Sequence, residues 1–212
     1  MTQNEISNKT PLWDNYYKYY TPTPLGVIMY GSHRKVLGRV LSALFKDKSV
    51  SILDVGCGKG STLSSIREWG FTNSIGIDLS EVGLLSCEKI GLRIGKDVFR
   101  VDATKTEYAD KSFDIVFSEG MLEHYTNFLP FADEMSRIAK DYIILVQPNH
   151  DCLYSQIIQI GWRLFRRNSG GVEELDHHLY EYDSAFSERG FKLVDCQFTP
   201  LKENAVLVFK RM

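Results

Sequence analysis

The stretch Ile52-Leu53-Asp54-Val55-Gly56-Cys57-Gly58-Lys59-Gly60 decides the fold that we predict for this chain. Its apolar, β-branched part, residues 50–55, indicates a buried strand. Glycines then take alternate positions, and Leu63, Ile66 and Trp69 follow at helical spacing. A strand that turns through glycines into a helix is typical of a ligand site, because glycine lets a ligand approach the main chain and a helix N-terminus offers unpaired N–H groups. A tight turn that binds no ligand stays open as the alternative.

The spacing of the glycines indicates which ligand the loop would take. A dinucleotide-binding loop has the pattern G-x-G-x-x-G, which would place its third glycine at position 61, where this chain has Ser61. The observed pattern G-x-G-x-G resembles motif I of the class I S-adenosylmethionine (SAM)-dependent methyltransferases. The resemblance implies that the loop wraps the amino-acid tail and ribose of SAM. It assigns cofactor contacts to Asp54, Gly56, Cys57, Gly58 and Gly60.

Three later motifs follow in the order that this family has. Asp78 lies 20 positions after Gly58 at the end of an expected strand, where an acidic residue binds ribose hydroxyls in nucleotide-binding units; capping of the next helix is the alternative, and Ser80 suits that role equally well. Asp102-Ala103 resembles motif III, which implies contacts to adenine. Residues 112–118 resemble motif IV. The resemblance therefore adds Leu79, Asp102, Ala103, Ser118, Glu119 and Gly120 to the expected cofactor contacts.

Alternating strands and helices along the rest of the chain predict an α/β fold. With the resemblance, we expect a Rossmann-like, doubly wound, seven-stranded and mostly parallel sheet that ends in an antiparallel C-terminal hairpin. We expect a single SAM-dependent methyltransferase domain over residues 1–212, with residues 1–30 as an N-terminal cap segment and residues 151–178 as an inserted lid-like segment. Residues 1–11 are polar and are expected to be mobile.

Two helices are predicted in more detail. One follows Gly31 with Ser32 as its N-cap and an amphipathic stripe that packs on the sheet. The other covers residues 81–92, and we expect Val82, Leu85 and Ile90 to face inward.

Composition sets the broad class of the protein. Hydrophobic residues make up 43% and charged residues 25% of the 212 residues, as in soluble globular domains. The net charge of −2 gives no global basic field, so we expect no nucleic-acid partner. No signal peptide and no bilayer-spanning run is present, and the four cysteines lie far apart, so a reducing cytoplasm is the expected location. Those cysteines are Cys57, Cys87, Cys152 and Cys196.

The expected activity is transfer of a methyl group from SAM to an O-, N- or C-nucleophile of a small molecule, with release of S-adenosylhomocysteine (SAH). A catalytically silent SAM-fold binding protein and a nicotinamide-dependent oxidoreductase are the alternatives. His124, His150 and Glu119 are the candidate catalytic residues, because they follow strands four and five at the carboxyl edge of the sheet. We predict no metal, since Gly120 stands where related quinone-biosynthesis O-methyltransferases carry the first glutamate of E-x-x-E-H.

The acceptor pocket is expected beside residues 118–124, under a roof formed by two segments with surplus apolar surface, Trp13–Tyr20 and Leu153–Phe165. Residues 153–167 are apolar with three arginines, which also allows a weak contact with a membrane surface. We expect a monomer or a homodimer.

Overall fold

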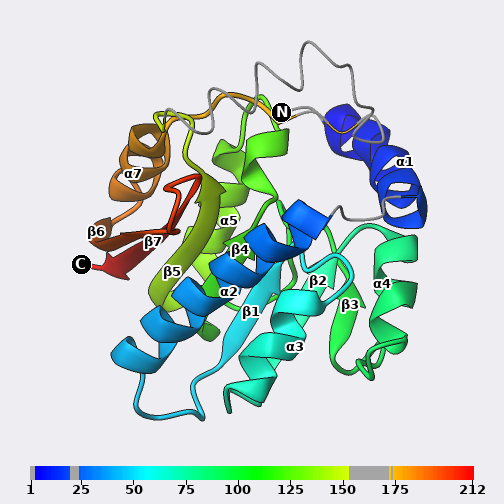
Figure 1. Ribbon diagram of the computed structural model, residues 1–212, viewed down its shortest axis with the longest axis horizontal. Coiled ribbons are helices and arrows are strands. Elements are labelled where there is room, and N and C mark those ends of the chain that lie inside the picture. The colour runs from blue at the N-terminus through cyan, green and yellow to red at the C-terminus, as the bar shows by residue number, and fades with distance from the viewer. Residues whose placement is uncertain (1–2, 20–23, 153–171, 173) are drawn as a thin grey trace.

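The computed structural model describes residues 3–19, 24–152, 172 and 174–212. Seven strands form one sheet in the order β3-β2-β1-β4-β5-β7-β6 (Figure 1). The first five strands are parallel, and β7 lies antiparallel between β5 and β6. The doubly wound, mostly parallel sheet with a C-terminal antiparallel hairpin is thereby confirmed. The strands are β1 (Ile52–Val55), β2 (Ser74–Asp78), β3 (Val98–Arg100), β4 (Phe113–Glu119), β5 (Ala139–Pro148), β6 (Phe191–Phe198) and β7 (Asn204–Arg211).

Helices cover both faces of this sheet, because the central strands are apolar on both sides. On β5, Ile143 and Leu145 belong to one core cluster, while Ile144 and Val146 belong to another. The first cluster contains α5 (Leu129–Ile138) and α7 (Leu179–Ser187), and the second contains α2 (Pro24–Leu44) and α3 (Ser61–Glu68). The remaining described helices are α1 (Gln3–Tyr19), α4 (Glu81–Glu88) and the 3-10 helix η1 (Leu122–His124).

The strand order reverses between β1 and β4, and this reversal positions the site. Parallel strands on either side of such a point send their helices to opposite faces, which leaves a crevice beyond the carboxyl ends of the strands. Asp54 pairs in register with Phe117, so the loop after β1 and residues 118–120 emerge side by side.

Residues 3–11 belong to α1, and their expected mobility stays a prediction. Two expectations about the helices were wrong. The second helix begins at Pro24, a residue suited to a first helical position, so Ser32 lies inside the helix and is not its N-cap. Helix α4 ends at Glu88, earlier than expected.

The inward face of α4 was also predicted incorrectly. Leu85 is 48% exposed and Ile90 46% exposed, while Leu84 and Cys87 are buried. The Ser80 hydroxyl caps this helix by accepting a hydrogen bond from the Gly83 N–H at 3.0 Å. The helix therefore begins at Glu81, as expected, and the error concerns which of its faces packs on the sheet. The expected lid-like segment, residues 151–178, and the apolar stretch 153–167 lie mostly or entirely outside the described residues.

A buried carboxylate links the loops around β2 and β3. Asp97 is 5% exposed and accepts hydrogen bonds from Arg67 Nη1 at 2.9 Å, from Arg93 Nε at 3.0 Å and from the Arg93 backbone N–H at 2.9 Å. The bonds from Arg93 and Arg67 hold the pKa of Asp97 well below its ordinary value. Because the pKa is lower in the folded chain than in the unfolded chain, this contribution to stability is present above about pH 4 and is lost as the pH falls through the folded-state pKa.

We therefore expect Asp97→Asn to lower the free energy of unfolding at pH 7 by about 1.5–3 kcal/mol, the range for hydrogen bonds to charged groups. Urea titrations at pH 7 and pH 3 would measure it, and the gap to the wild type should narrow at pH 3. The control is Asp110→Asn, which breaks an exposed pair with Arg137 and should change stability by less than about 1 kcal/mol. A gap of the same size at both pH values would contradict the assignment.

Candidate functional site

The loop after β1 has a backbone that requires glycine. Gly56, Gly58 and Gly60 have φ angles of 76°, 51° and 72°, a region that L side chains rarely adopt. The space around them is also closed, since a Cβ on Gly56 would lie 2.7 Å from Met121 Sδ. Alternate glycines are therefore a requirement of the fold of this loop, in which Gly58 and Gly60 are buried and Gly56 faces the crevice.

Asp78, at the end of β2, holds this loop. Its Oδ2 accepts a hydrogen bond from the Gly58 N–H at 2.8 Å, and its Oδ1 accepts one from the Ser80 N–H at 2.7 Å. Burial raises the pKa of Asp78, although these two backbone hydrogen bonds oppose that shift. Of the two roles weighed for Asp78, capping of α4 belongs to Ser80, and ribose binding stays a prediction. Asp78 itself joins the glycine loop to the start of that helix.

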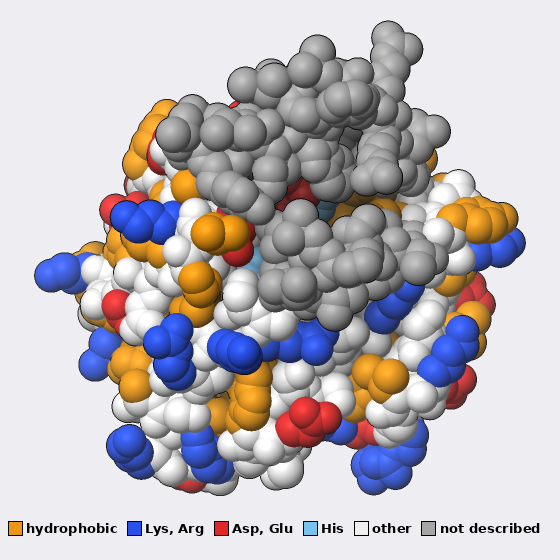
Figure 2. All heavy atoms as spheres, viewed as in Figure 1, with side chains coloured by type: hydrophobic (Ala, Val, Ile, Leu, Met, Phe, Trp, Pro, Cys, Tyr) orange, Lys and Arg blue, Asp and Glu red, His pale blue; other side chains and the backbone are white. Residues whose placement is uncertain are grey.

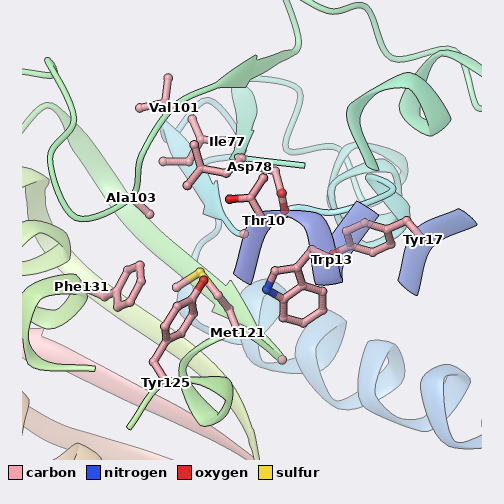
Figure 3. Close-up of a pocket in the computed structure, with 13 residues that line it drawn as sticks. Thr10, Trp13, Tyr17, Ile77, Asp78, Val101, Ala103, Met121, Tyr125 and Phe131 are labelled. Carbon is pink, nitrogen blue, oxygen red and sulfur yellow. The ribbon is translucent and has the colours of Figure 1, made fainter. Parts of the chain in front are cut away.

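A cavity with an empty volume of about 490 Å³, part of it open to solvent, lies over the loop and the ends of β2 and β3. Figure 3 shows Trp13 and Tyr17 on α1, with Tyr125 and Phe131 across the cavity from them and Asp78 at its wall. Most of the remaining lining is apolar, so the cavity combines one carboxylate with a slot that suits a flat ring. The lining residues are Thr10, Trp13, Tyr17, Gly56, Ile77, Asp78, Leu79, Val101, Ala103, Gly120, Met121, Tyr125 and Phe131.

Helix α1 is attached to the site by polar and aromatic contacts. Asp14 Oδ1 accepts hydrogen bonds from the Ser80 hydroxyl at 2.5 Å and from the Val82 N–H at 3.3 Å, so it places a negative charge at the N-terminus of α4. Lys9 Nζ donates to the backbone carbonyl of His124. The Tyr17 hydroxyl lies 2.5 Å from the position that a Cβ on Gly58 would take. Sequence reasoning missed Lys9 and Asp14, because their partners lie far along the chain.

A second cavity, with an empty volume of about 610 Å³, adjoins the first. Trp13 lines both cavities and packs edge-on against His124, with 4.8 Å between the ring centroids. His124 therefore stands at the wall of the second cavity, next to residues of the first. The described residues that line the second cavity are Lys9, Leu12, Trp13, His124, Thr126, Val172 and Leu175.

The cofactor residues expected from the sequence are only partly brought together. Five of them line the first cavity, namely Gly56, Asp78, Leu79, Ala103 and Gly120. Asp102 lies next to that lining and accepts hydrogen bonds from the backbone N–H and the hydroxyl of Thr104 at 2.8 and 2.7 Å. Cys57 packs with Leu63 and Leu84 in a separate apolar cluster. Asp54 is buried beneath the loop, where burial raises its pKa well above the ordinary value.

The end of β4 and the loop after β5 hold the remaining candidates. The Ser118 hydroxyl donates to the Val55 carbonyl at 2.9 Å, which fixes β4 to β1. Glu119 Oε2 accepts from the Thr62 hydroxyl at 2.6 Å, and its Oε1 lies 3.5 Å from His33 Nδ1. His150 is buried with Nδ1 3.8 Å from Asp176 Oδ1, and burial lowers its pKa. Glu119 and His150 are not among the described residues that line the two cavities.

No group of three or more His, Cys, Asp or Glu side chains among the described residues is arranged to hold a metal ion. Within the described ranges, no helix combines the length and apolar character that crossing a bilayer requires. Figure 2 shows lysine and arginine side chains spread among polar and apolar ones on the face seen there, and not gathered in one patch.

Part of the chain is similar to known methyltransferases. Residues 53–145 match the model of the methyltransferase domain. Ajmaline N-methyltransferase of Rauvolfia serpentina is 29% identical over 66% of this chain and 54% of its own length. A phthiotriol/phenolphthiotriol dimycocerosates methyltransferase of Mycobacterium tuberculosis is 31% identical over 42% of this chain and 33% of its own length. The matched part thus spans about half or less of these relatives.

A solved structure agrees over almost the whole chain. Magnesium protoporphyrin IX methyltransferase from Synechocystis PCC 6803, with bound SAH, superposes with a TM-score of 0.73 at 17% identity and covers 98% of this chain and 96% of that protein. At this identity the likeness shows the fold alone. Residues 53–145 therefore resemble a methyltransferase domain, and the chain has the fold of this solved methyltransferase.

Proposed function

We propose that this protein transfers the methyl group of SAM to a small-molecule acceptor and releases SAH. The observation that carries the proposal is the first cavity, in which a glycine loop held by Asp78 meets an apolar slot at the carboxyl edge of the sheet. The match of residues 53–145 to a methyltransferase domain and the fold shared with a SAH-bound methyltransferase both support SAM as the cofactor. Its electrophilic methyl group supplies the reactive carbon, and the protein supplies alignment and a cavity that excludes water.

The residues of the first cavity fit the parts of SAM. The main chain at Gly56, which lines this cavity, suits the amino-acid tail. Free lone pairs of the Asp78 carboxylate can accept hydrogen bonds from ribose hydroxyls, since each oxygen uses one lone pair for a backbone N–H. Leu79, Val101 and Ala103 suit the adenine ring. Asp102 remains our proposal for the adenine amino group.

The second cavity is our proposed acceptor site. It touches the first at Trp13, and its walls are mainly apolar, which suits an organic acceptor. The names of the similar proteins mention three different small molecules, ajmaline, phthiotriol and magnesium protoporphyrin. They support a small-molecule acceptor but do not select one. His124 lines this cavity and is our first proposal for a base. Glu119 and His150 stay proposals, although they are not among the described residues that line the cavity.

The proposal for Asp78 makes a direct prediction. We expect Asp78→Ala to weaken SAH binding by about 1.5–3 kcal/mol, because the variant loses a carboxylate that bridges two hydroxyls and frees the Gly58 N–H. Calorimetry would measure the affinity and a thermal melt the stability, which should also fall. Asp133→Ala, at an exposed carboxylate paired with Arg189, is the control and should leave the affinity unchanged. Unchanged SAH affinity in folded Asp78→Ala would restrict Asp78 to supporting the loop.

The proposed roof formed by α1 makes a second prediction. Asp14→Ala removes the acceptor for the Ser80 hydroxyl and the Val82 N–H, so hydrogen exchange of α1 amides should become about five- to tenfold faster, as for loss of a helix cap worth about 1 kcal/mol. The control, Asp14→Asn, keeps an oxygen acceptor and should exchange nearly as the wild type does.

SAH should slow the exchange of α1 in the wild type, because Thr10, Trp13 and Tyr17 line the cavity that we assign to it. Hydrogen exchange mass spectrometry reports all three results on intact protein. If SAH binds and α1 exchanges at an unchanged rate, α1 does not roof the cofactor site.

A further inference from the structure

One acidic side chain at the junction of the two cavities has no assigned role. Glu123 lies in η1 and is 3% exposed. Its Oε2 is buried and has no hydrogen-bond partner among the residues that the structure describes. Burying a carboxyl group without such a partner costs folding free energy, so its retention at this position calls for a ligand or a chemical role.

Glu123 lies between residues of the two cavities, although it is not among the described residues that line either one. Its Oε1 lies 3.6 Å from where a Cβ on Gly120 would stand, and Gly120 lines the first cavity. The same oxygen is 3.8 Å from Nε2 of His124, which lines the second cavity. A carboxyl group at this junction is near the point where a methyl donor in the first cavity would meet an acceptor in the second.

The surrounding charges favour a cation in the acceptor site. Burial raises the pKa of Glu123 well above its ordinary value, and the carboxylates of Glu174 and Glu119 raise it further. The groups that face it also include the Tyr182 hydroxyl and His124. The nearby ammonium of Lys9 is engaged by the His124 carbonyl and by the Tyr125 ring, 4.8 Å from the ring centroid. An anionic acceptor would meet several carboxylates here, whereas an ammonium would offset them.

We propose that the acceptor is an amine with an apolar or aromatic body, and that Glu123 binds its nitrogen and takes its proton. This inference rests on the proposed function and names its substrate class, and for an amine acceptor it gives the role of base to Glu123 in place of His124. Leu12, Val172 and Leu175 would enclose the body of the amine, and the Trp13 ring offers a face to a cationic nitrogen.

The proposed step balances in atoms and charge. The bound ammonium gives one proton to the Glu123 carboxylate, and the nitrogen keeps the electron pair. That pair forms the new bond to the methyl carbon, while the electrons of the broken carbon–sulfur bond stay on sulfur. The methylated product leaves as an ammonium ion, and the proton on Glu123 returns to water when the product dissociates.

Binding to the SAH complex tests this without turnover. The probes are 2-naphthylmethylamine and its alcohol counterpart, 2-naphthalenemethanol, titrated calorimetrically into the protein saturated with SAH. We expect the wild type to bind the amine at least about tenfold more tightly, as for a hydrogen bond to a charged group. Because burial raises the pKa of the Glu123 carboxyl group, binding of the cationic amine should also displace protons from it, which titrations in phosphate and in Tris would reveal.

Glu123→Gln keeps the shape of the side chain and removes its charge. It should abolish the preference for the amine and the proton release, with SAH affinity within about twofold of the wild type. The matched control is Glu203→Gln, which alters another buried carboxyl group with an unpartnered Oε2 and lines neither cavity; it should keep both properties.

Two results would overturn the inference. Equal affinity of the wild type for amine and alcohol would do so without any variant, and so would an unchanged preference in Glu123→Gln. Failure of the wild type to bind SAH would instead refute the proposed function on which the inference rests, and the two failures are distinguished by the first titration.

Discussion

The hydrogen bond from the Gly58 N–H to the Asp78 carboxylate, 2.8 Å long, is the contact on which the rest of the site depends. It joins the loop after β1 to the end of β2, and the second oxygen of the same carboxylate fixes the start of α4. Glycine is required on the loop side because three residues there have positive φ angles. One buried carboxylate therefore determines the shape of the surface to which we assign the cofactor.

The topology then brings the other parts to this surface. The reversal of strand order places the ends of β1 and β4 together, and η1 continues from β4 with Glu123 and His124. Helix α1 contacts both halves, because Asp14 binds the start of α4 and Trp13 packs against His124. The Trp13 side chain thus lines both cavities, so cofactor and acceptor would both contact it.

Much of the fold and the core of the site were predictable because they depend on local sequence. Strand, alternate glycines and helix follow one another within residues 52–68, and Asp78 stands at the spacing that a βαβ unit sets. The attachment of α1 was not predictable, since Asp14 and Ser80 are 66 positions apart and neither belongs to a recurrent pattern. The inward face of α4 was wrong because apolar residues lie on both sides of this helix, with Leu84 buried and Leu85 exposed, so the sequence pattern does not select one face. The role of Glu123 needed the packed structure, since only burial and an unpartnered oxygen distinguish it from a surface glutamate.

The most direct test of the account is calorimetric titration of the wild-type protein with SAH and, separately, with NAD. The glycine loop, the Asp78 carboxylate and the apolar slot predict binding of SAH in the micromolar range, about −8 kcal/mol, and no measurable binding of NAD. Binding of NAD without binding of SAH would contradict the account, because the loop held by Asp78 would then serve a dinucleotide.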